Sequence, residues 1–139
     1  MKLILKEGKK YVLRCDRGEE VIEELKKFCQ AKKIGAAFFS AIGAAAEVEL
    51  AHYDVDKKRY SNKIIRQKLE INSLTGNIAL MDGKIIAHGH GVFSDQAMQT
   101  QAGHVNRLTV AATCEIFLEV SKGKIGRRYD KETGLNLMQ

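Results

Sequence analysis

Residues 83–104 read GKIIAHGHGVFSDQAMQTQAGH, and this stretch is the most informative feature of the sequence. Its first part, Gly83 to Ala87, has the composition of a strand, and residues two apart on a strand project from the same face. The side chains of His88 and His90 are therefore expected to point at one spot. Neighbouring glycines leave both imidazoles uncrowded, which suits a small cation held by nitrogen ligands.

A third histidine, His104, follows a predicted turn. If the strand continues to Asp95 and residues 96–98 form a three-residue loop, Asp95 faces Gln99 and His104 lies directly opposite His90. No Asn-Gly or Asp-Gly marks this turn, so a slip by one residue would send His104 to the other face. Three neutral histidines leave one coordination position of a divalent metal open, which is typical of a reactive or ligand-binding site.

A simpler interpretation stands beside the metal site. Histidines on a half-buried strand are often hydrogen-bonded core or rim residues, although one metal would satisfy both adjacent imidazoles together. Asp95 could be a fourth ligand or could support one, but an aspartate at a strand end is more often a turn residue. His52 is a further possible ligand, with a solvated histidine at a strand end as the favoured alternative.

Length and composition indicate one domain. At 139 residues the chain is long enough to bury a core without disulfides, and no linker or repeat divides it. The three cysteines are widely spaced within apolar patterns, as expected of buried thiols in a reducing compartment. No apolar run is long enough for a signal peptide or a membrane span, so we expect a cytoplasmic protein without membrane contact.

The hydrophobic pattern predicts an α+β fold. Apolar residues recur at helical spacing from Glu19 to about Lys33, where Asp16 to Glu19 resembles a capping box and Gly35 is expected to end the helix. This long amphipathic helix follows a first strand at Tyr11–Cys15. Further strand patterns occupy residues 36–43, 47–54, 64–79 (as a pair), 84–95, 108–120 and 124–130. The prediction is a mostly antiparallel sheet of about seven strands with one helix.

Ordered motifs along the chain resemble those of one family, the PPC domain. They are RCDRGEE at 14–20, SAIGA at 40–44, EINSLTGNI at 70–78, the histidine segments, TCEI at 113–116 and RYDKETGL at 128–135. This plant and prokaryote conserved domain is also called DUF296, and bacterial members are often labelled PD1-like DNA-binding proteins. The resemblance makes residues 1–139 a single domain with its core at about 11–135. Gly89 and Ala102 depart from the family pattern but leave the histidines in place.

The resemblance implies several properties. Family members have an antiparallel sheet with a flanking helix, and they assemble as homotrimers through sheet edges. In prokaryotic members the matching histidines form a metal site, commonly taken as zinc, which corresponds here to His88, His90 and His104. In plant relatives a separate AT-hook segment binds the DNA minor groove, and this sequence contains no such segment.

The leading hypothesis is a homotrimer with a three-histidine site for a divalent metal, expected to be zinc. A small anionic or carbonyl ligand would enter the open position. Arg14 and Glu70 are weak candidates for a charge partner and an acid or base, since surface roles explain them more simply. If the protein is an enzyme, hydrolysis or hydration is the expected class.

Two hypotheses from other classes remain open. The net charge of +6 permits a DNA-associated regulatory protein that contacts phosphates through the basic surface of the trimer. Alternatively, the domain is a structural oligomerisation module in which the histidines only hydrogen-bond one another. The sequence leaves open the ligand, the metal, the biological role, and whether the histidine site lies within one subunit or between two.

Overall fold

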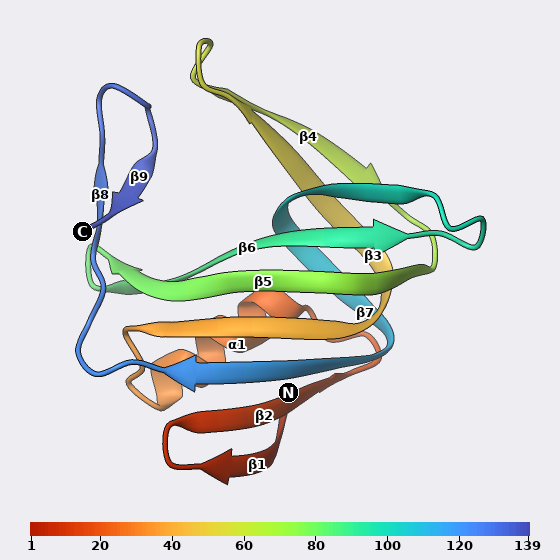
Figure 1. The fold of residues 1–139 in the computed structure, drawn as a ribbon, viewed down its shortest axis with the longest axis horizontal. Coiled ribbons are helices and arrows are strands. Elements are labelled where there is room, and N and C mark those ends of the chain that lie inside the picture. The colour runs from red at the N-terminus through yellow and green to blue at the C-terminus, as the bar shows by residue number, and fades with distance from the viewer.

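The computed structural model describes all 139 residues and has an α+β fold built on antiparallel strands (Figure 1). A single helix, α1, covers Val21–Ala31. The strands are β1 (Lys2–Glu7), β2 (Lys10–Asp16), β3 (Ala37–Asp54), β4 (Arg59–Ile65), β5 (Leu69–Met81), β6 (Lys84–Ser94), β7 (Thr100–Val120), β8 (Arg127–Tyr129) and β9 (Asn136–Met138). No helix is both long and apolar enough to cross a membrane.

Seven strands form one sheet in the order β1-β2-β7-β6-β5-β3-β4, and β8 pairs with β9 in a separate small sheet. An additional pairing joins β3 to β7. Because β3 also pairs with β5, β5 with β6, and β6 with β7, these four strands close into a ring. This closure leaves no free edge within the ring and fixes the relative positions of strands β6 and β7.

Two strands, β3 and β7, are longer than the predicted strands. The predicted strands 36–43 and 47–54 are one strand, β3, whose pairing with β7 shifts register on both sides of Ala45. Gly43 permits this continuity, because it has φ +151° and a Cβ there would lie 2.2 Å from the Thr113 carbonyl oxygen. Gly43 therefore lets the β7 backbone come close to β3. Strand β1 was not predicted, and the predicted strand 124–130 shortens to β8.

The helix is amphipathic as predicted but shorter. Its N-cap is Glu20, whose carboxylate accepts from the backbone N–H groups of Ile22 and Glu23. The same carboxylate accepts from the Leu108 N–H of β7 at 2.9 Å, which holds residue 20 extended and delays the first turn. The predicted end at Gly35 is wrong, because Lys33 already adopts the left-handed conformation at φ 56°.

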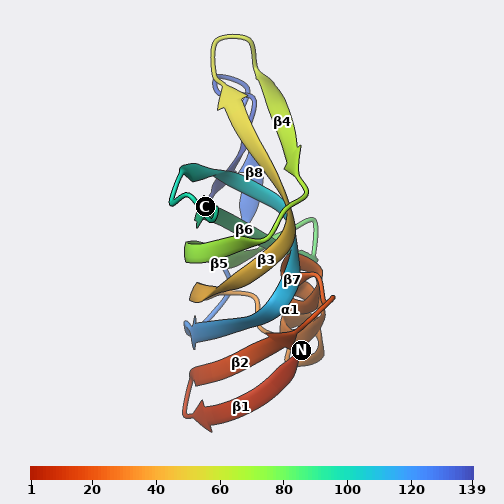
Figure 2. The same cartoon turned by 90° about the vertical axis from the view of Figure 1, so that its right-hand side faces the viewer.

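The core lies between α1 and one face of the sheet, which we call the inner face (Figure 2). Leu13, Phe39 and Leu118, on three neighbouring strands, are at most 1% exposed there. All three cysteines are free and buried, which confirms the prediction of buried thiols. The side chains that alternate with these residues occupy the opposite, outer face, where no helix covers them.

Two projecting hairpins approach each other beside the outer face. Strands β3 and β4 form an arm that extends beyond the sheet, and the loop of the β8–β9 hairpin lies near the tip of this arm (Figure 1). The Tyr53 hydroxyl donates to the Thr133 carbonyl oxygen at 2.8 Å, and Lys58 Nζ donates to the Lys131 carbonyl oxygen at 2.8 Å. These hydrogen bonds join residues 80 and 73 positions apart in the chain and position the hairpin.

Candidate metal centre

Strands β6 and β7 bring the three histidines together. His88 and His90 are two apart on β6, and His104 of β7 pairs directly with His90. The turn between the strands has the predicted form: the Asp95 N–H donates to the Gln99 carbonyl oxygen, and Met98 adopts φ 60°. The predicted register is therefore confirmed, although no glycine occupies the left-handed position.

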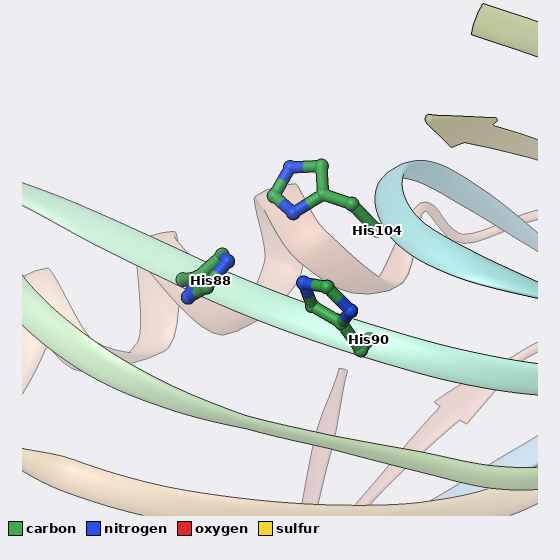
Figure 3. Close-up of side chains that lie close together, drawn as sticks. All are labelled: His88, His90 and His104. Atoms are coloured by element: carbon green, nitrogen blue, oxygen red, sulfur yellow. The ribbon is translucent and has the colours of Figure 1, made fainter. Parts of the chain in front are cut away.

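The three imidazoles converge on one point (Figure 3). One potential ligand nitrogen from each ring lies within 4.8 Å of the others, and the ring centroids are 5.0 to 5.3 Å apart. His90 is exposed, whereas His88 and His104 are half-buried. All three side chains come from one chain, and no carboxylate or thiol completes the cluster.

Glycines on the inner face support the strand that carries the histidines. Phe39, Gly76 and Gly89 are consecutive cross-strand neighbours on β3, β5 and β6. A Cβ at Gly76 would lie 2.5 Å from the Phe39 ring, and a Cβ at Gly89 would lie 3.3 Å from it. The Phe39 ring therefore occupies the space that side chains would fill beneath the histidine strand. A side chain is therefore excluded at position 76, whereas one at position 89 would require the Phe39 ring to shift slightly.

Burial keeps two of the imidazoles neutral at pH 7. It lowers the pKa of His88 to about 4, with further contributions from the positive charge of Arg127 and from His104 and His90. Burial also lowers the pKa of His104, assisted by His90 and Arg127. A neutral imidazole has a free lone pair, which a metal ligand requires.

Arg127 is a site residue that the sequence analysis missed. Its Nη2 lies 3.2 Å from His88 Nδ1 and donates to Asn77 Oδ1 at 2.8 Å, while Nη1 donates to the Asn136 carbonyl oxygen at 2.9 Å. Burial lowers the pKa of this guanidinium, which remains charged at neutral pH. In the sequence this position belongs only to the predicted strand 124–130, and no local pattern links position 127 to position 88.

Two neighbouring hollows open beside the cluster, with volumes of about 330 and 350 Å³. Both are lined by Tyr60, His88, His104 and Leu135. The first also contacts Arg127 and the second His90. The cluster is therefore accessible to a small molecule, and a hollow of this size is within the range of small-ligand sites.

The other candidate residues lie elsewhere or have another role. Asp95 Oδ1 accepts from the Ala97 and Gln99 N–H groups, so Asp95 is a turn residue. His52 lines the second hollow but is outside the three-histidine cluster.

Neither Arg14 nor Glu70 lines either hollow. Arg14 Nε donates to Asp16 Oδ1 at 3.0 Å on β2, and Glu70 is exposed on β5 opposite Ser94. The structure thus brings together His88, His90 and His104 but not these two residues.

The fold and the cluster define a class: small antiparallel-sheet domains with one flanking helix and three converging histidines. The sequence matches the Plants and Prokaryotes Conserved (PCC) domain over residues 4–122, and the chain belongs to this family. No curated protein matches the sequence.

Solved structures of high similarity share this fold over nearly their whole length. A metal-containing protein from Archaeoglobus fulgidus is 34% identical with TM-score 0.89, over 100% of this chain and 99% of that one. A plant- and prokaryote-conserved protein from Pyrococcus horikoshii is 31% identical with TM-score 0.88, over 95% and 92%. A proposed DNA-binding protein from Bacteroides thetaiotaomicron is 30% identical with TM-score 0.93, over 97% and 94%.

Proposed function

We propose that His88, His90 and His104 bind one divalent metal ion, zinc in the first instance, and leave a position open for a small anionic or carbonyl ligand. The observation that carries this proposal is the convergence of three imidazole nitrogens within 4.8 Å, without a fourth protein ligand. Structural zinc sites usually fill all four positions with protein groups, whereas ligand-binding and catalytic sites keep one open. The metal-containing relative from A. fulgidus supports the assignment.

The residues present fit such an ion chemically. Imidazole nitrogens suit zinc and other borderline divalent metals, and the low pKa of His88 and His104 keeps both lone pairs available at neutral pH. When bound, the ion supplies a Lewis-acid position that polarises an oxygen of the ligand. The surrounding side chains hold the histidines in place and shield two of them from solvent.

Metal content tests the proposal directly. Protein purified without an affinity tag or chelator is analysed for metals, beside the double variant His88→Ala with His90→Ala. We expect about one ion per chain in the parent and almost none in the double variant. His52→Ala is the matched control, because this histidine lines the same hollow outside the cluster and its loss should leave the metal content unchanged. A parent that carries no metal and takes up no added zinc contradicts the proposal.

We also propose that the domain assembles as a homotrimer, as the family resemblance implies. Phe38, Ile42 and Phe117 are 55 to 57% exposed on the outer face, close to Leu5 of β1. Contiguous exposed apolar residues are typical of interaction surfaces. Light scattering is expected to give three times the chain mass, and Phe117→Ser should reduce it. Val55→Ser, at an equally exposed apolar residue on the arm, should not.

DNA binding is the second candidate function. The proposed DNA-binding relative from B. thetaiotaomicron and the net charge of +6 favour it. Two basic side chains on or next to the arm are already paired with acids: Lys57 with Asp54, and Arg66 with Glu47. If DNA is a partner, its binding should weaken steeply as the salt concentration rises from about 50 to about 200 mM. Binding that disappears at physiological salt would count against a DNA-directed role.

A further inference from the structure

The hollows beside the histidines have an unbalanced charge. Among their lining residues Arg127 is a fixed cation, and no aspartate or glutamate is present. Arg127 forms no ion pair anywhere in the protein. A divalent ion on the three histidines would raise the local charge further without a protein anion to offset it. A partly buried excess of positive charge of this kind is stabilised by an anionic ligand.

The hydrogen bonds of Arg127 are incomplete. Three neutral acceptors engage its two terminal nitrogens, namely Asn136, Asn77 and His88. Its Nε is buried and has no partner. A guanidinium has five N–H donors in a planar fork that matches a carboxylate in two places. Arg127 therefore retains binding capacity beside the cluster.

Metal binding would release one more donor. Arginine only donates hydrogen bonds, so His88 Nδ1 must be the acceptor in its 3.2 Å contact with Arg127 Nη2. A neutral imidazole has a single lone pair, on one of its two nitrogens. If a metal takes that lone pair, the contact with Arg127 is lost, whichever nitrogen of His88 ligates. Occupation of the histidine site thus frees Arg127 Nη2 to bind a ligand.

From these observations we propose that the ligand of the open position is a small carboxylate and that Arg127 binds its carboxylate group. This inference rests on the proposed metal site. The hollow that contains Arg127 also presents Met81, Ile86, Leu135 and Leu137, so the rest of the ligand is a short apolar chain. A 2-oxo or 2-hydroxy acid has this chemistry, because an oxygen adjacent to its carboxylate can reach the metal while the carboxylate meets the guanidinium.

Ligand binding to the metal-loaded protein tests the inference. Cobalt(II) replaces zinc, 2-oxobutyrate is titrated as the probe, and calorimetry and the visible cobalt absorption report binding. Uncharged 2-butanone is the control ligand. Three variants are compared with the parent: Arg127→Gln, which removes the charge; Arg127→Lys, which keeps it; and Arg128→Gln, which removes an exposed charge from the adjacent position.

We expect the parent and Arg128→Gln to bind 2-oxobutyrate with a change in the cobalt spectrum, and 2-butanone to bind far more weakly. Arg127→Gln should keep one metal per chain but lose roughly tenfold to a hundredfold in affinity for the acid, the range of a hydrogen bond to a charged group. Arg127→Lys should recover part of that loss. A metal-loaded Arg127→Gln that binds the acid as tightly as the parent overturns the inference. A metal-loaded parent that binds no acid also overturns the inference, but the proposed metal site then stands. A parent that binds no metal overturns both the inference and the proposed metal site.

Discussion

Phe38 and Phe39 are adjacent in β3, but they lie on opposite faces of the sheet and have opposite roles. Phe39 is fully buried on the inner face, where its ring packs against Gly76 and Gly89 under the strand that carries His88 and His90. Phe38 is 57% exposed on the outer face, in the same cross-strand row as Asn77 and His88. The inner face therefore stabilises the fold, and the outer face is free to carry a binding site and an association surface.

Replacing each of the two phenylalanines with alanine tests this difference between the faces most strongly. Phe39→Ala removes a fully buried ring and should lower the free energy of unfolding by about 3–5 kcal/mol. Phe38→Ala should lower it by at most about 1 kcal/mol at low protein concentration, since most of its ring is already exposed. Urea denaturation at two protein concentrations measures both effects. If Phe38 lies in the proposed trimer, its replacement should also reduce the dependence of stability on concentration.

Equal losses for the two variants at low concentration would show that the faces are not energetically distinct. Gly126→Ala serves as a control for substitution itself, because φ there is not positive and a Cβ would have no neighbour closer than 4.0 Å. It should change stability by no more than about 0.5 kcal/mol.

How much of the structure can be predicted from the sequence depends on how far apart in the chain the interacting residues are. The β6–β7 hairpin was predicted in register because alternation and loop length are local properties of residues 83–104. The strand break expected near Gly43 is absent because the close approach of β7, seventy positions later, sustains the pairing. Arg127 could not be assigned to the site for the same reason. Its position depends on the contacts of the β8–β9 hairpin with the arm and with β5.

The second prediction concerns pH and the partly buried His88. Its pKa is about 4 in the folded state and about 6.5 in the unfolded state, so between these values the unfolded state binds more protons. Stability of the metal-free protein should therefore be complete above pH 6.5 and fall as the pH drops toward 4. Allowing for solvent screening of this half-buried group, the loss attributable to His88 is about 1–2 kcal/mol.

Urea denaturation in the presence of chelator, at pH 4 to 7, compares the parent with His88→Asn. The variant should lose less stability over this pH range, since it lacks the imidazole whose pKa is lowered in the folded state. Parallel curves for the two proteins would mean that the outer face does not desolvate this imidazole in the way the structure indicates.

A smaller effect is expected at the contact between the arm and the β8–β9 hairpin. Tyr53→Phe deletes the hydroxyl that donates to the Thr133 carbonyl oxygen and should cost about 0.5–1.5 kcal/mol. Because the bond joins the arm to the hairpin, the loss should be local: hydrogen exchange should accelerate at Asp130 and Gly134, whose N–H groups close the hairpin loop. Tyr129→Phe, at an exposed tyrosine of the same hairpin, should leave both rates unchanged. If Tyr53→Phe also leaves them unchanged, the Tyr53 hydroxyl does not position the hairpin. Lys58 would then be the remaining hydrogen-bond link from the arm, and Arg127 would be held beside His88 chiefly by its own hydrogen bonds to Asn77 and Asn136.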